Sequence, residues 1–323
     1  MIGGDQALEI DPRPAEVARF AEDVLEGLSC PRKATPPKWL YDARGSALYE
    51  LICEQPEYYP PRIETGLLER HGPDLAAAIG EGALLFEYGA GSARKTALLL
   101  AALARPAGYV PVDISPEALA SAVASMRQRF PRLPLRPIVA DFTERVDLPF
   151  EDLPGRRRVA FFPGSTIGNF EPPEAVALLH RMARDAGRGG MLVIGVDLPK
   201  HEQVLVDAYD DARGVTAAFD LNLLARVNRE LGGDFQLSAF RHRAVWNHRL
   251  SRIEMHLVAT EAQEVRVADR TFRFAEGESL HTESAYKWDP RAFDALAAIA
   301  GWQPEAAFAD DRAWFSVRLY RAR

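Results

Sequence analysis

The sequence predicts an α/β protein built on a doubly wound, Rossmann-like sheet, together with a second α+β domain. Two observations support this prediction. Short apolar segments of strand type alternate with amphipathic helical segments between residues 83 and 198, as in sheets of mainly parallel strands. Glycine and acidic residues follow several of these strands, at the edge where such sheets bind ligands.

The composition of the 323-residue chain is that of an ordinary globular protein. Hydrophobic residues make up 47% and charged residues 26% of the sequence, which is enough apolar material for a sizeable core. The net charge of −7 provides no basic surface and disfavours nucleic-acid binding. Cys30 and Cys53 offer no disulfide framework and favour a reducing cytoplasm. The longest apolar run, residues 97–104, is too short to cross a membrane.

The predicted elements begin with two helices and a loop. Residues 14–29 have apolar side chains at helical spacing, and residues 45–54 predict a second, shorter helix. Prolines interrupt residues 54–64, so we predict a loop there that carries Tyr59.

Strands and helices then alternate. Ser115 as N-cap and Pro116 at the first helical position mark the start of one helix. The predicted strands span residues 83–88, 108–115, 135–143, 158–169 and 190–198, and the helices span residues 92–104, 115–130 and 172–187.

The alternation stops at residue 200 and resumes at residue 289. Residues 200–232 are of helical type, and the strand-like stretches that follow are 244–260 and 264–274. A closing helix and two strands, the last one antiparallel, are predicted at 289–302, 304–311 and 314–323.

This change of pattern predicts two domains. Residues 62–199 and 286–323 would form the sheet domain. Residues 1–61 and 200–285 would form the second domain, which we expect to bind the substrate.

The turn after the first strand has the outline of a nucleotide-binding turn. Gly89 and Gly91 match the first two glycines of the dinucleotide fingerprint G-x-G-x-x-G, but Arg94 occupies the third position. The third glycine allows close helix–strand packing beneath a pyrophosphate, so its absence argues against NAD. S-adenosylmethionine (SAM) has no phosphate and is compatible with this turn.

Polar residues at the ends of the next two strands fit the same cofactor. Asp113 ends the second strand and suits the ribose hydroxyls. Asp141 and Phe142 end the third strand and suit the adenine amine and ring. Each residue alone also fits a plain turn or the start of a helix. Their order at successive strand ends favours SAM.

Several longer segments resemble the SAM-dependent histidine Nα-methyltransferases of ergothioneine biosynthesis. PGSTIGNF and LLARVNRELGGDF are the most specific phrases. The resemblance implies a class I methyltransferase fold with a second domain, and the conversion of L-histidine to hercynine by three methyl transfers. The matching segments are residues 41–64, 86–96, 110–115, 140–142, 161–170, 195–200, 208–235 and 281–288.

The resemblance implies a cofactor site and a substrate site. On the cofactor side, Gly89 and Lys95 match residues near the amino-acid part of SAM, and Asp113, Asp141 and Phe142 match the ribose and adenine contacts.

On the substrate side, Tyr59 matches a tyrosine near the amine, and Asn169 and Tyr209 match groups that hold the amine and the carboxylate. Gly164 matches a turn residue near both ligands. We expect Tyr59 and Asn169 to orient the amine for catalysis, with no metal involved.

Met255 and Glu283 match residues around the substrate imidazole, but the neighbouring pattern departs from the family. The family often has a serine two residues beyond this glutamate, where this chain has Ala285. Ser284 would point to the opposite face of a strand. Ala285 cannot form the second hydrogen bond to the imidazole that this serine provides, which is worth about 0.5–1.5 kcal/mol. An N-methyltransferase of another aromatic amino acid, such as tryptophan, therefore stays open as the alternative.

Two other classes are less well supported. Arg94 opposes an NAD-dependent dehydrogenase, and the set Tyr59, Asn169, Tyr209 and Glu283 opposes a non-catalytic SAM-binding protein. We expect a cytoplasmic monomer that acts on a small molecule, with no nucleic-acid or membrane partner.

Overall fold

The computed structural model describes residues 13–153 and 157–323. The chain divides into two compact units, each assembled from three stretches of sequence. Unit 1 is Met1–Leu40, Ala217–Arg243 and Met255–Glu283, and unit 2 is Tyr41–Thr216, Ala244–Glu254 and Ser284–Arg323. The domain boundaries that the sequence suggested fall at other residues and stay a prediction.

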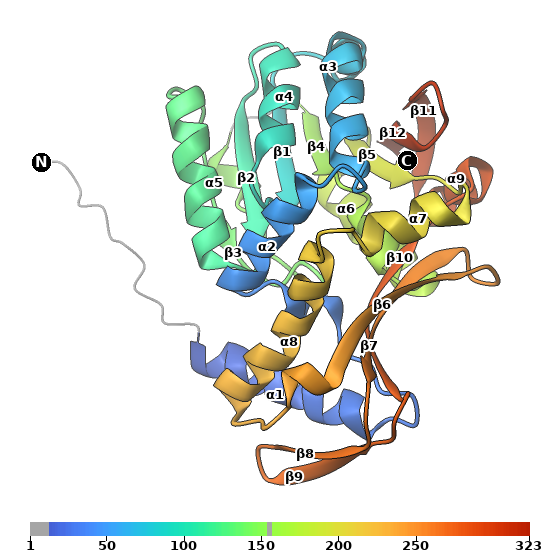
Figure 1. Cartoon of the computed structure of the whole chain (residues 1–323). Helices are drawn as coiled ribbons and strands as arrows, with labels where there is room; N and C mark the ends of the chain where they lie inside the picture. The colour runs from blue at the N-terminus through green and yellow to red at the C-terminus, as the bar shows by residue number, and fades with distance from the viewer. Residues whose placement is uncertain (1–12, 154–156) are drawn as a thin grey trace, which may run out of the picture. The chain divides into compact units, whose positions relative to one another are not determined.

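Figure 1 labels the helices and strands of both units. The helices are α1 (Arg13–Ser29), α2 (Ala43–Cys53), α3 (Pro60–Ile79), α4 (Arg94–Ala102), α5 (Pro116–Arg129), α6 (Pro172–Ala186), α7 (Glu202–Tyr209), α8 (Val215–Leu231) and α9 (Pro290–Ile299). The 3₁₀ turns are η1 (Pro37–Leu40), η2 (Phe150–Asp152), η3 (Thr166–Asn169) and η4 (Leu237–Ala239). The strands are β1 (Ala83–Tyr88), β2 (Gly108–Asp113), β3 (Ile138–Val139), β4 (Arg157–Phe162), β5 (Met191–Asp197), β6 (Phe240–Asn247), β7 (Arg252–Ala259), β8 (Gln263–Val267), β9 (Arg270–Phe274), β10 (Ser279–Tyr286), β11 (Trp302–Ala309) and β12 (Phe315–Ala322).

The main sheet belongs to unit 2 and is largely parallel. Within the described residues it has seven strands, in the order β11-β12-β5-β4-β1-β2-β3. β1 pairs in parallel with β2 and β4, whereas β12 runs antiparallel to β5 and β11. This confirms the predicted α/β, Rossmann-like sheet and its antiparallel last strand. The strand order reverses between β1 and β4, so ligands are expected beyond the carboxyl ends of these strands.

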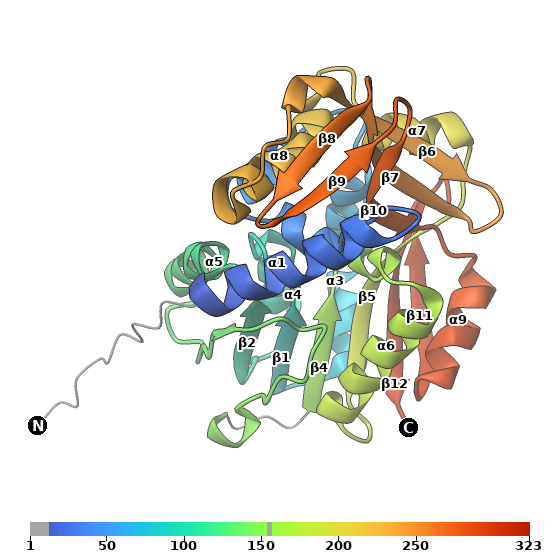
Figure 2. The same cartoon turned by 90° about the horizontal axis from the view of Figure 1, so that it is seen from below.

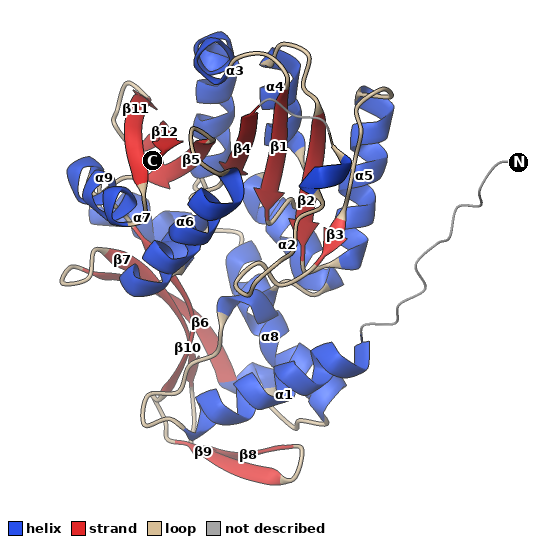
Figure 3. Ribbon diagram, turned by 180° about the vertical axis from the view of Figure 1, so that it is seen from behind, coloured by secondary structure: helices blue, strands red, loops and turns tan. Residues whose placement is uncertain are grey.

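Helices cover both faces of this sheet (Figure 3). Leu84 and Phe86 of β1 pack into a core that includes α6 and α9. Leu85, which points the other way, packs into a second core that includes α3, α4 and α5. Burial on both faces explains why these strands are continuous apolar runs in the sequence.

Unit 1 has an apolar core of its own. Phe235, Phe240 and Phe274 pack edge to face, with ring centroids 5.3–6.0 Å apart. The guanidinium of Arg226 lies over Phe20, 4.6 Å from the ring centroid. The β8–β9 hairpin lies beside α1 (Figure 2). The strands of a second sheet, ordered β10-β7-β6, each contribute residues to both units.

The structure corrects several predicted elements. The proposed loop at 54–64 contains the start of α3 at Pro60, and prolines at the first positions of a helix favour such a start. The strand predicted for 158–169 ends at Phe162, because the chain then turns through Gly164 at φ 79°. The strand predicted for 135–143 is reduced to Ile138–Val139. The helical stretch 200–232 is divided into α7 and α8.

Candidate active site

The turn between β1 and α4 is fastened to the end of β2. The backbone N–H groups of Gly89 and Ala90 donate to the Val112 carbonyl at 2.8 and 3.2 Å. The Gly91 N–H donates to Asp113 Oδ2 at 3.0 Å. Gly89 and Gly91 have φ values of 76° and 48°, a region that glycine enters without a steric penalty.

Phe142 lies beside this turn. A Cβ atom on Gly89 would lie 3.4 Å from Phe142 Cε1. Asp141, the residue before it, accepts a hydrogen bond from the Thr143 N–H at 2.9 Å through Oδ1. Gly89, Asp113 and Phe142 are thus brought together at the carboxyl ends of β1 and β2. This open glycine turn, with an acid and an aromatic ring beside it, fits the ribose and adenine of SAM.

Glu64 of α3 joins two further predicted residues. Its side chain is 1% exposed and lies 2.5 Å from Lys95 Nζ. It also accepts from the Gly164 N–H, at 2.8 and 3.0 Å. Gly195 makes room for it, since a Cβ atom there would lie 2.1 Å from Glu64 Oε1. Lys95 and Gly164 are therefore neighbours across one buried carboxylate.

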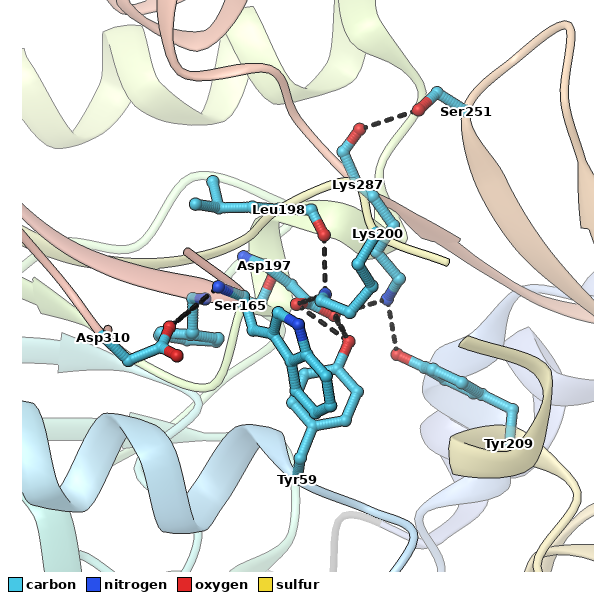
Figure 4. Close-up of polar contacts among 11 residues, drawn as sticks. Tyr59, Ser165, Asp197, Leu198, Lys200, Tyr209, Ser251, Lys287 and Asp310 are labelled. Carbon is cyan, nitrogen blue, oxygen red and sulfur yellow. Dashed lines mark hydrogen bonds and ion pairs between the residues drawn. The ribbon is translucent and has the colours of Figure 1, made fainter. Parts of the chain in front are cut away.

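A buried network connects two predicted substrate residues, Tyr59 and Tyr209 (Figure 4). Asp197, which ends β5, accepts the Tyr59 hydroxyl at 2.7 Å and lies 3.0 Å from Lys287 Nζ. Lys287 Nζ donates to the Tyr209 hydroxyl at 2.9 Å. Lys200 Nζ donates to Asp197 and to Tyr59, both at 2.6 Å. The side chains of Asp197, Lys200 and Lys287 are between 1% and 3% exposed.

Burial and charge together set the ionisation of this network. Burial alone would raise the pKa of Asp197, but Lys287 and Lys200 bring it below its ordinary value. Burial lowers the pKa of Lys200 to about 8, although Asp197 opposes the shift. Burial, and then the Asp197 charge, raise the pKa of Tyr59 well above its ordinary value. At neutral pH Tyr59 is therefore a neutral phenol beside an ionised carboxylate.

Asn169 ends η3, which packs closely on the end of β10. A Cβ atom on Gly168 would lie 2.8 Å from the Tyr286 carbonyl oxygen and 3.7 Å from the backbone carbon of Ala285. Glycine at 168 is thus what allows this approach. Asn169 and Ala285 both lie in unit 2, together with Tyr59 and Tyr209.

Met255 and Glu283 lie in unit 1, on the neighbouring strands β7 and β10. They are 2% and 7% exposed. Thr282, next to Glu283, donates its hydroxyl to the Met255 carbonyl at 3.2 Å. The two residues predicted to contact the substrate imidazole are therefore close in space, and their roles stay a prediction.

Four residues of this site had no role in the sequence analysis: Glu64, Asp197, Lys200 and Lys287. All four lie in segments that carry the family resemblance. Asp197 follows the rule that identified Asp113, because it is an acid at the carboxyl end of an apolar strand. The burial of the two lysines has no comparable signal in the sequence.

Residues 13–153 and 157–323 contain neither a metal-binding cluster nor a membrane-spanning helix. No group of three or more His, Cys, Asp or Glu side chains there is arranged to hold a metal ion. No helix in the same residues combines the length and apolarity that a membrane span requires.

The fold and the site together define a class I SAM-dependent methyltransferase. A Rossmann-like sheet with an antiparallel last strand carries a glycine turn, an acid and an aromatic ring at successive strand ends. The particular family follows from comparison with known proteins. The model of the SAM-dependent, histidine-specific methyltransferases matches residues 20–322. The chain belongs to this family and is a SAM-dependent N-methyltransferase, as the resemblance implied.

Individual relatives match along nearly the whole chain. Histidine N-alpha-methyltransferase from Mycolicibacterium smegmatis is 42% identical over 304 residues, covering 92% of this chain and 93% of that protein. The protein of the same name from Mycobacterium tuberculosis is 38% identical over 303 residues, covering 92% and 93%. An L-tryptophan methyltransferase from Psilocybe serbica is 27% identical over 345 residues, covering 93% and 92%.

Proposed function

We propose that this enzyme transfers three methyl groups from SAM to the α-amino group of L-histidine, forming hercynine for ergothioneine biosynthesis. Membership of the histidine-specific family and 42% identity to a histidine N-alpha-methyltransferase support this proposal. The structural observation that carries it is the Asp197 network. It joins the hydroxyls of Tyr59 and Tyr209 in one chain of hydrogen bonds, which suits the two polar ends of an α-amino acid.

We propose that the cofactor residues act as the sequence suggested. SAM, when bound, supplies a methyl group already activated by its sulfonium. Gly89 and Lys95 would hold its amino-acid part, Asp113 its ribose hydroxyls, and Asp141 with Phe142 its adenine. Asp113 suits this role, because it ends β2 directly beside the glycine turn.

The substrate residues would position the amine rather than activate it chemically. Transfer to an amine depends mainly on holding donor and acceptor in line, and the amine must be neutral to attack. Tyr59 and Asn169 would orient the amine, Tyr209 would hold the carboxylate, and Gly164 would line the turn between substrate and cofactor. Because the pKa of Tyr59 is raised, Tyr59 stays a phenol at neutral pH and does not serve as a phenolate base.

Met255 and Glu283 would surround the imidazole. A buried carboxylate that accepts the ring N–H discriminates against side chains without such a donor. The indole of tryptophan also carries an N–H donor, and Ala285 lacks the hydroxyl that the family often provides. Tryptophan methylation therefore remains the second candidate.

Mass spectrometry of the products tests the proposal directly. The protein is incubated with SAM and each of the twenty amino acids in turn. Mono-, di- and trimethylated histidine are the expected products. Methylated tryptophan without methylated histidine would replace the proposal by the second candidate.

We also propose that the enzyme works as a cytoplasmic monomer without a nucleic-acid or membrane partner. The net charge of −7 supports the lack of a nucleic-acid partner. Light scattering at several protein concentrations would measure the oligomeric state.

A further inference from the structure

Separate parts of unit 2 converge on the Asp197 carboxylate. Tyr59 precedes α3, Asp197 ends β5, and Lys287 follows β10. Tyr209, at the end of α7, is attached through Lys287. Figure 4 shows the two tyrosine hydroxyls directed toward this centre from different elements. The chemistry of each bond determines which partner holds the proton.

The hydrogen bonds of Tyr59 run in a fixed direction. An ionised carboxylate only accepts, so Tyr59 donates its proton to Asp197, at 2.7 Å. An ammonium only donates, so the Tyr59 oxygen accepts from Lys200, at 2.6 Å. Lys200 also donates to Asp197 and to the Leu198 carbonyl, which uses all three of its protons. Tyr59 therefore meets any further ligand as an acceptor, which suits an amine N–H and not a carboxylate.

Tyr209 has the opposite polarity. Lys287 donates to the Tyr209 oxygen at 2.9 Å, so the Tyr209 proton is turned toward a different acceptor. Within the described residues, Asp197 and Tyr209 account for two of the three Lys287 ammonium protons. The third is available to an anion. This third Lys287 proton therefore suits a substrate carboxylate.

The charge of the network is also unbalanced. In the part of the chain that the structure describes, Asp197 is the one carboxylate within 4.0 Å of Lys200 and Lys287. Asp310 acts on Lys200 from a longer distance. Two ammonium groups and one carboxylate leave one surplus positive charge away from water, and uncompensated buried charge is costly. A bound carboxylate would neutralise it.

We propose that Asp197 and Lys287 are positioning residues that distinguish the two ends of the substrate. This rests on the proposed methylation of an amino acid. Asp197 holds the Tyr59 hydroxyl as an acceptor for the amine N–H. Lys287 holds the Tyr209 oxygen through a hydrogen bond, donates its remaining proton to the carboxylate, and supplies the charge that the carboxylate neutralises. The amine is thereby presented in one direction.

Two fragments of histidine separate the halves of the network. Imidazolepropionate keeps the carboxylate and lacks the amine, whereas histamine keeps the amine and lacks the carboxylate. Each is titrated as an inhibitor of histidine methylation. Lys287→Met should raise the inhibition constant of imidazolepropionate about tenfold to a hundredfold, as for a lost hydrogen bond to a charged group. It should raise the inhibition constant of histamine less than about twofold. Asp197→Asn should weaken inhibition by histamine more than inhibition by imidazolepropionate. Equal weakening of both fragments by both variants would overturn the proposal.

A double-mutant cycle tests whether Asp197 acts through Tyr59. Asp197→Asn should cause little further loss of kcat/KM for histidine once Tyr59→Phe is present, because the hydroxyl that Asp197 orients is then gone. Additive losses would contradict this positioning role. If Asp197→Asn fails to fold, Lys287→Met with the two fragments decides alone. Lys287→Met removes the surplus positive charge and leaves Asp197 paired with Lys200.

A matched control comes from the same unit. The Asp294 carboxylate also accepts from a tyrosine hydroxyl, that of Tyr320 at 2.7 Å, and from Arg318 at 2.5 Å. Asp294→Asn should leave the inhibition by both fragments unchanged. Turnover of histidine by the wild-type enzyme tests the proposed function separately. If wild-type turnover is observed and the fragments respond alike, this inference alone fails.

Discussion

Glu87 occupies the carboxyl end of β1, yet its carboxylate is turned into the core. Thr96 donates its hydroxyl to it at 2.7 Å, and Tyr109 donates as well. Burial raises the pKa of Glu87 to about 8, despite these two hydrogen bonds, which lower it. Between pH 4.5, the ordinary pKa of a glutamate, and about pH 8, the folded protein therefore binds more protons at this site than the unfolded chain does.

This shift predicts that stability falls as pH rises. Because the folded-state pKa of Glu87 is raised, its contribution is complete below pH 4.5 and is lost through pH 8, by up to about 1.4 kcal/mol per pH unit. Glu87→Gln should flatten this slope in urea unfolding measured from pH 5 to 8. Glu69→Gln, which changes an exposed residue of α3, should keep the wild-type slope. Parallel curves for wild type and Glu87→Gln would exclude the effect.

Glu283 makes a second prediction at the scale of one side chain. Glu283→Ala should raise the KM for histidine by about tenfold to a hundredfold, the range expected for a lost hydrogen bond to a charged group. The KM for SAM should stay unchanged, since the proposed contact is with the imidazole. Steady-state kinetics measure both constants. An unchanged KM for histidine would remove Glu283 from substrate recognition.

A substitution at Ala285 is predicted to improve the recognition of histidine. Ala285→Ser restores the hydroxyl common in the family and should lower the KM for histidine about twofold to tenfold, as for one neutral hydrogen bond. Ser284→Ala, one position away, should not reproduce this gain. If Ala285→Ser instead raises the KM, the buried position, 4% exposed, has no room for the hydroxyl.

The residues of the site differ in how visible they are in the sequence. Tyr59 and Tyr209 could be found from the family resemblance, and Asp113 from its place at a strand end. Lys200 and Lys287 could not, because a lysine after a strand has the same local pattern whether it is solvated or buried. Their burial results from contacts with Asp197, which is distant in sequence from Lys287.

At the scale of elements, β5 depends on a glycine facing α3. A Cβ atom on Gly195 would lie 2.1 Å from Glu64 Oε1 and 2.9 Å from Phe315 Cζ. Gly195→Ala should displace Glu64 from Lys95 and cost about 1–3 kcal/mol of stability. It should also weaken the binding of SAM. Urea unfolding and calorimetric titration of SAM measure the two effects.

The control for this substitution lies in the same helix as Glu64. Gly66 has no heavy atom within 4 Å of an added Cβ. Gly66→Ala should therefore stabilise the protein by up to about 1 kcal/mol, as expected in a helix interior, and leave SAM binding unchanged. Equal effects of the two substitutions would mean that the packing of Gly195 on Glu64 is unimportant.

Elements with strong apolar periodicity were predictable, and those defined by local breaks were not. β1, β5 and α6 agree with prediction to within two residues, because each buries an apolar face. The sequence analysis predicts no helix at α3 (Pro60–Ile79), because Pro60 and Pro61 indicate a loop there, although proline also fits the first turn of a helix. The break between α7 and α8 depends on Asp211, which accepts the N–H groups of Val215 and Thr216, a contact that hydrophobicity does not show.

At the scale of the whole molecule, cofactor binding should stabilise unit 2. The proposed contacts at Gly89, Asp113 and Phe142 exist only in the folded state. A ligand at a hundred times its Kd adds about 2.7 kcal/mol to the free energy of unfolding. S-adenosylhomocysteine should therefore raise the Tm, and Asp113→Asn should reduce the shift. NAD should give none, and a shift with NAD equal to that with S-adenosylhomocysteine would contradict the cofactor assignment.

The architecture of the main sheet could be predicted, whereas the predicted domain boundaries stay a prediction. The sequence shows where the alternation of strands and helices stops, and this change of pattern is the basis of the predicted second domain. The units of the structure, however, divide β6, β7 and β10 within each strand. A strand keeps its period of two across such a boundary, so no change of pattern marks it.

The three-part composition of unit 2 has a consequence for protein engineering. Tyr59 and Asp197 lie in one stretch of the chain and Lys287 in another, with stretches of unit 1 between them. A chimaera with a single crossover near residue 240 would combine Tyr59 and Asp197 from one parent with Lys287 from the other. A chimaera that keeps the proposed Asp197 network of one parent intact therefore needs both stretches from that parent.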